Sequence, residues 1–120
     1  MIEIKIPISI GELLDKISIL SIKSQCTNNQ YVLKELQDLI QIAKESQVYN
    51  DSYLTKLFQV NQKLWKIEDD LRVLEKEQRF DEEFIELARS VYITNDLRAQ
   101  IKKEINEETQ SIYQEIKLYG

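Results

Sequence analysis

Two cations, Arg98 and Lys102, lie one helical turn apart on a stripe of the sequence that is otherwise largely apolar. Apolar side chains precede and follow them at helical spacing: Phe84, Leu87, Ala88, Val91, Ile105, Ile112 and Ile116. A cation on the core-facing side of a helix is costly unless an acceptor pairs with it. The two side chains are therefore expected either to form a buried salt-bridge network or to bind an anionic group such as a phosphate or carboxylate.

Polar side chains follow the same helical spacing on two other segments, around residues 10–25 and 52–78. We expect the three polar lines to converge on one cluster, with Glu68 as the acceptor for Arg98 and with Trp65 or Tyr92 as a flat apolar wall. The alternative is a structural network, in which Glu68 pairs with Arg72 along its own helix and salt bridges set the helix register. The candidate ligand-binding residues are Glu12, Asp15, Lys16, Asn61, Trp65, Glu68, Arg72, Arg89, Tyr92, Asn95, Asp96 and Arg98.

Catalytic chemistry has few candidates, because the chain contains no histidine and one cysteine, Cys26. The absence of histidine removes imidazole acid–base catalysis and most zinc sites. The acidic pair Glu83 and Glu86 lies one helical turn apart, as Glu12 and Asp15 do, and resembles the metal-binding pairs of all-helical nucleotide pyrophosphohydrolases. The pair fits equally well as negative charge at the start of a helix. We predict no metal and no cofactor, and no catalytic residue is assigned.

The composition favours long helices with short connections, because the 120 residues include only two glycines and one proline. We predict one all-α domain over residues 1–120, an antiparallel bundle of about four helices within residues 10–118. The expected helices cover about 10–25, 31–46, 52–78 and 81–117. The last of them is expected either to run unbroken or to kink near Asn95.

The first eight residues form a separate pattern, in which Ile2, Ile4, Ile6 and Ile8 alternate with other residues. This period of two predicts a short β-strand arm over residues 1–8. Because no second strand is evident, we expect the arm to pair with a second copy of the chain in a homodimer. Apolar residues near the end of the long last helix would need the same partner.

Net charge and hydropathy limit the other partners. The formal net charge of −5 argues against non-specific nucleic-acid binding and against an anionic membrane surface. No apolar run approaches the ~20 residues of a membrane span. With a single cysteine and no signal-peptide pattern, a cytoplasmic location is expected.

Three sequence blocks carry a resemblance to known proteins. They are Gly11-Glu-Leu-Leu-Asp-Lys16, the run from Val60 to Asp69, and the run from Phe80 to Ala99. With these blocks in this order, the chain resembles a family of small, functionally uncharacterised helical proteins from bacteria and their viruses. The resemblance implies a stand-alone fold and no particular chemistry. A fainter similarity of the first helix to helical chorismate mutases implies an enzyme that holds a dicarboxylate.

The sequence leaves two functions open. The first is a non-catalytic binding or assembly module whose polar cluster recognises an anionic partner. The alternative is a small all-helical enzyme that acts on an anionic metabolite, such as a nucleotide or sugar phosphate.

Overall fold

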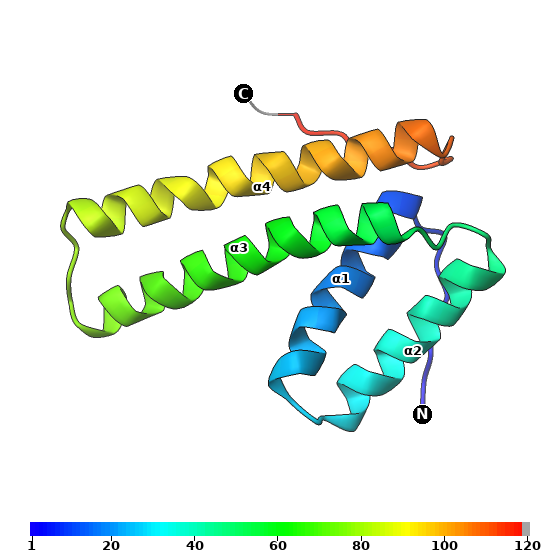
Figure 1. Cartoon of the computed structure of the whole chain (residues 1–120), viewed down its shortest axis with the longest axis horizontal. Helices are drawn as coiled ribbons and strands as arrows, with labels where there is room; N and C mark the ends of the chain where they lie inside the picture. Colours follow the sequence, from blue (N-terminus) through cyan, green and yellow to red (C-terminus); the bar gives the residue numbers. More distant parts are fainter. Residues whose placement is uncertain (119–120) are drawn as a thin grey trace.

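The computed structural model describes residues 1–118, and their helices form two antiparallel hairpins (Figure 1). The first hairpin consists of α1 (Ile10–Cys26) and α2 (Gln30–Glu45), and the second of α3 (Asp51–Lys76) and α4 (Glu82–Glu108). The shorter hairpin crosses one half of the longer one, and the other half of the α3–α4 hairpin extends beyond it (Figure 1). Helix α1 lies next to all three other helices and so forms the centre of the fold. The all-α prediction is confirmed.

The helices begin where short polar side chains cap them. Ser9, Asn29 and Asn50 each accept a hydrogen bond from a backbone N–H in the first turn of α1, α2 and α3. These bonds satisfy donors that have no partner within the helix. Asp81 precedes α4, although its side chain makes no capping hydrogen bond.

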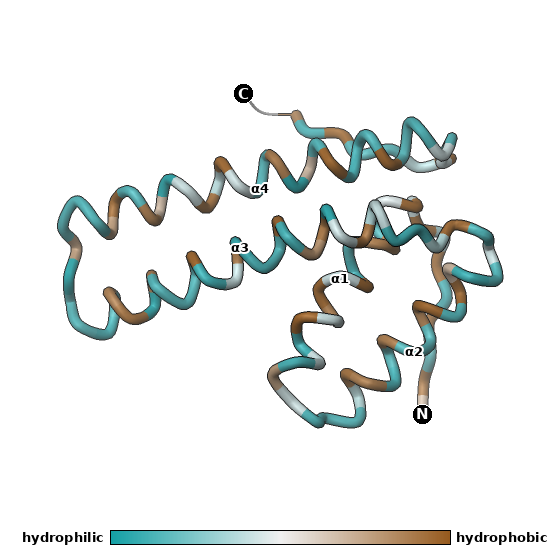
Figure 2. Tube along the Cα trace, viewed as in Figure 1, coloured by the Kyte–Doolittle hydropathy of each residue, from teal (hydrophilic) through white to brown (hydrophobic). Residues whose placement is uncertain are grey.

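The core lies at the junction of the two hairpins. Leu14, Ile17, Leu57 and Ile105 come from α1, α3 and α4 and are almost completely shielded from solvent. Hydrophilic and apolar residues alternate along every helix (Figure 2), which is the pattern of helices that bury one face. This core holds α1 against α4, and the candidate site lies at that contact.

The predicted β-strand arm is wrong. No strand is present among the described residues, and residues 1–8 follow an extended path beside α2 (Figure 1). The side chains of Ile2, Ile4 and Ile6 are largely exposed. An isolated extended segment has no backbone ladder to join, so an alternating pattern alone does not produce a strand.

Helix α4 runs without interruption through Asn95, and it ends at Glu108, about nine residues earlier than predicted. Gln110 adopts a positive φ of 55°, and the backbone N–H of Ser111 donates to the carbonyl of Asn106 at 2.8 Å. This is the hydrogen-bonding pattern of a helix C-cap. The following residues, 112–118, turn back and run alongside α4 (Figure 1). We call residues 112–118 the returning segment.

Candidate functional site

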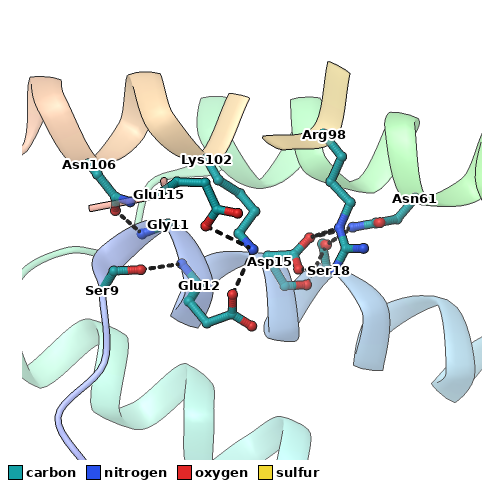
Figure 3. A network of polar contacts seen from close by, with 10 residues as sticks. All are labelled: Ser9, Gly11, Glu12, Asp15, Ser18, Asn61, Arg98, Lys102, Asn106 and Glu115. Atoms are coloured by element: carbon teal, nitrogen blue, oxygen red, sulfur yellow. Dashed lines mark hydrogen bonds and ion pairs between the residues drawn. The ribbon is translucent and has the colours of Figure 1, made fainter. Parts of the chain in front are cut away.

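A network of polar side chains lies where α1 contacts α3, α4 and the returning segment (Figure 3). Glu12 and Asp15 project from α1, and Arg98 and Lys102 from α4. Within each helix the two residues are about one turn apart, so both point to the same side. The crossing of α1 and α4 therefore brings two carboxylates opposite two cations.

Asp15 is the centre of the first half of this network, and its side chain has no exposed surface. Arg98 donates from Nε to Asp15 Oδ1 at 3.0 Å and from Nη2 to Oδ2, a two-bond pair. Asn61 on α3 donates from Nδ2 to Asp15 Oδ1 and to Ser18 Oγ, both at 2.8 Å. The hydrogen bond to Asp15 raises the pKa of Arg98 above its ordinary value, against the opposing effect of burial. A buried carboxylate with several charge-assisted bonds is well satisfied.

Lys102 forms the second half, and it is buried between two carboxylates. Its Nζ lies 2.6 Å from Glu12 Oε2 and 3.4 Å from Glu115 Oε2. Glu12 belongs to α1, whereas Glu115 belongs to the returning segment. The ammonium group of Lys102 thus joins the two hairpins and also holds the returning segment against α4.

Helices α1 and α4 approach closely beside this lysine because Gly11 has no side chain. A Cβ atom at Gly11 would lie 2.7 Å from the carbonyl oxygen of Lys102 and 2.9 Å from Asn106 Oδ1. The backbone N–H of Gly11 donates to that same Asn106 oxygen at 2.7 Å. Asn106 Nδ2 is buried without a hydrogen-bond partner among the described residues.

Two shallow pockets lie along α4 next to the returning segment. The first, of about 280 Å³, is lined by Arg98 and Lys102 together with Tyr92 and Asn95. The second, of about 390 Å³, lies toward Gln100. The lining residues common to both pockets are Asp96, Ala99, Glu115 and Lys117.

Of the twelve candidate residues, the structure joins four in the network: Glu12, Asp15, Asn61 and Arg98. Three more line the first pocket: Tyr92, Asn95 and Asp96. Asp96 also pairs with Lys117, at 3.2 Å.

The remaining candidates lie outside the network, and the predicted partner of Arg98 is wrong. Glu68 is exposed, and the carboxylate that pairs with Arg98 is that of Asp15. Arg72 is exposed as well and lies 3.9 Å from Asp69 on its own helix. The reason is geometric, because α1 packs against this part of α4 and brings its own carboxylate to the guanidinium. The candidates outside the network and the first pocket are Lys16, Glu68, Arg72 and Arg89, which are exposed, and Trp65, which is half-buried.

Sequence reasoning missed several members of the site. Lys102 was predicted together with Arg98, because both lie on the same stripe. Ser18, Asn106 and Glu115 carried no signal, because a serine or asparagine within a helix is usually solvent-exposed and Glu115 was placed inside a helix. Gly11 preceded a run of helical residues and gave no indication that a second helix crosses it.

The fold and the network define a small helical protein in which two hairpins are joined by buried ion pairs. The chain belongs to a protein family of unknown function, DUF6165, whose model matches residues 4–120. Neither a curated protein nor a solved structure matches the chain significantly. The resemblance to an uncharacterised family is thereby confirmed.

Two further observations describe what residues 1–118 contain. No helix in this part of the chain is long and apolar enough to cross a membrane. No group of three or more Asp, Glu, Cys or His side chains within it is placed to hold a metal ion.

Proposed function

We propose that the protein is a non-catalytic binding module, and that it recognises an anionic group of its partner at the first pocket along α4. The observation that carries this proposal is the position of Lys102. Its ammonium group is already paired with Glu12 at 2.6 Å, and it still has a second carboxylate, that of Glu115, at 3.4 Å. The site therefore has the space and donors for one carboxylate beyond the pairs that join α1 to α4.

The local charges support the same function. Glu12 and Asp15 balance Lys102 and Arg98, so the four residues that join the helices are neutral together. Glu115 adds a third carboxylate from a different segment. A carboxylate or phosphate oxygen of a partner can take its place at Lys102 without burying an unpaired charge, which would be costly.

The walls of the pocket supply contacts of other kinds. Tyr92 is exposed at the pocket, and Asn95 is half-buried there with an amide that can donate and accept. Arg89 forms a hydrogen bond with Tyr92, which raises the pKa of Arg89, so a further cation lies beside the tyrosine. An aromatic ring, an amide and cations together suit a polar ligand with an anionic group.

Ligand-dependent melting of the full chain tests this function. The panel contains phosphate, dicarboxylates, nucleotides, sugar phosphates and acidic peptides. A ligand at about 100 times its dissociation constant stabilises the folded state by about 2.7 kcal/mol. The Lys102→Met variant is expected to lose the response, whereas Lys66→Met, which removes an exposed lysine on α3, is expected to keep it.

Two results would contradict the proposal. One is a panel in which no anion raises the melting temperature of the parent protein. The other is an equal response of the parent and Lys102→Met. Chemical conversion of a bound nucleotide or sugar phosphate would instead identify the alternative, a small enzyme that acts on an anionic metabolite.

We also propose that the protein forms a homodimer in the reducing cytoplasm. The exposed apolar side chains of the arm, Ile2, Ile4 and Ile6, support a second copy as the cover of this surface. Light scattering over a range of concentrations tests the assembly. A mass that stays near the 14.3 kDa of one chain would exclude the dimer.

A further inference from the structure

The returning segment occupies the surface to which the anionic partner is assigned. We propose that residues 112–118 act as an internal ligand, and that an extended peptide segment of a partner protein, with a Glu or Asp side chain, displaces them. The inference rests on the proposed function, because it adds the class of ligand and the regulation of the same site.

The two pockets along α4 indicate that the segment divides one longer groove. They share Asp96 and Ala99 of α4 as well as Glu115 and Lys117 of the segment itself. If the segment moves away, the pockets join along α4. At the same time Lys102 loses one of its two carboxylates. Release of the segment therefore creates both the space and the unsaturated cation that a ligand needs.

The segment is held mainly by polar contacts. The side chains of Ile112, Ile116 and Leu118 are 91%, 71% and 93% exposed, so burial of apolar surface contributes little to its position. Its ion pairs to α4 include Glu115 to Lys102 and Lys117 to Asp96, and Lys117 and Asp96 are both partly solvated. The Lys117–Asp96 pair is solvated and contributes little to stability, so the Glu115–Lys102 pair is the main ionic contact that holds the segment. A segment bound in this way can exchange with a competitor that offers the same groups.

The segment also indicates the chemistry of that competitor. It follows a non-helical path along α4 after the turn at Gln110 (Figure 1) and brings one carboxylate to the ammonium group of Lys102 (Figure 3). A peptide with a Glu or Asp side chain reproduces both features. Seven extended residues span roughly 23 Å, so such a peptide can reach the walls of both pockets.

The test uses a labelled peptide with the chain's own sequence over residues 110–118, Gln-Ser-Ile-Tyr-Gln-Glu-Ile-Lys-Leu. Its binding to the full chain is measured by fluorescence anisotropy for the parent, for Glu115→Gln, and for the control Glu86→Gln. Glu86 is an exposed carboxylate near the start of α4, and it lines neither pocket.

The Glu115→Gln variant is expected to bind the peptide on the order of tenfold more tightly than the parent, because the parent must first release its own segment. Glu86→Gln is expected to bind as the parent does. A peptide with Gln in place of its Glu is expected to bind more weakly to the parent and to both variants. Hydrogen exchange of residues 112–118 in the parent should accelerate when the original peptide is added.

Several outcomes would overturn the inference. Equal affinity of the parent and Glu115→Gln would show that the segment does not compete for the groove. A concentration-dependent dimer of the parent that Glu115→Gln abolishes would assign the groove to the same segment of a second copy. If the peptide binds no protein while small anions still stabilise the parent, the inference fails and the proposed function stands. If neither peptide nor small anions bind, both fail.

Discussion

Replacement of Arg98 by methionine tests whether the buried pair with Asp15 holds the two hairpins together. The change keeps a side chain of similar length and removes both hydrogen bonds to the carboxylate. Asp15 has no exposed surface, so its charge cannot reach water when the guanidinium is gone. Removal of one partner from a fully buried pair typically costs about 3–5 kcal/mol.

The structure places this variant at the lower end of that range. The side chain of Arg98 is 27% exposed, so the pair is partly solvated, and Asn61 continues to donate to Asp15. We expect a loss of about 3 kcal/mol. For 120 residues the unfolding entropy is about 0.25 kcal/mol/K, which gives a fall in melting temperature of about 12 °C.

Thermal and urea denaturation followed by circular dichroism measure the effect in a double-mutant cycle. Asp15→Asn alone is expected to cost less, about 1–2 kcal/mol, because the freed guanidinium can turn toward water. The double variant Arg98→Met with Asp15→Asn is expected to cost less than the sum of the two, since it leaves no unpaired charge.

Arg72→Met is the matched control, because Arg72 is exposed and lies 3.9 Å from its nearest acidic partner. Its stability is expected to remain within about 0.5 kcal/mol of the parent. If Arg98→Met melts within about 2 °C of this control, the pair does not hold the hairpins together. Strict additivity in the cycle would refute the reasoning as well.

Three further predictions concern other parts of the molecule. Gly11→Ala should lower the melting temperature by several degrees, because the new Cβ clashes with the Lys102 carbonyl. Such a clash typically costs about 1–3 kcal/mol, which exceeds the gain in helix propensity of up to ~1 kcal/mol. An unchanged or raised melting temperature would exclude the close approach of α1 to α4 at Gly11. Glu108→Gln should lower the pKa of Tyr53 in an ultraviolet titration, because the hydrogen bond to Glu108 raises that pKa. The raised pKa means that the folded state favours the neutral phenol. The stability that this hydrogen bond contributes is therefore present below about pH 10 and is lost as the pH rises through the raised pKa. Trp65 is half-buried and should show partial iodide quenching, whereas a fully water-exposed emission spectrum would contradict its position.

The helices follow from local information in the sequence. Periodic apolar residues and the caps Ser9, Asn29 and Asn50 define where α1, α2 and α3 begin. These signals act within one or two turns of a helix, so they are readable without knowledge of the fold. The polar line through Arg98 and Lys102 was readable for the same reason, and it correctly indicated that a buried cation needs a partner.

The ends of the chain depended on contacts that the local pattern does not contain. Residues 1–8 alternate like a strand, yet a strand requires a neighbour, and the described chain offers none. The residues after Glu108 have a helical pattern, yet Ser111 Oγ accepts a hydrogen bond from the backbone N–H of Ile10, and Glu115 pairs with Lys102. Residues 1–8 lack a neighbouring strand, and the residues after Glu108 contact α1 and α4. In both cases these long-range conditions outweighed the local periodicity.

The partner of Arg98 was decided only by the tertiary structure. Spacing along a helix shows which side chains share a face, and Glu68 on α3 and Asp15 on α1 both satisfied that condition. Which of them meets the guanidinium depends on how the hairpins cross, and the crossing depends on the core around Leu14 and Ile105 and on the missing side chain at Gly11. The sequence determined that Arg98 needs an acceptor, and the packing of α1 against α4 determined that the acceptor is Asp15.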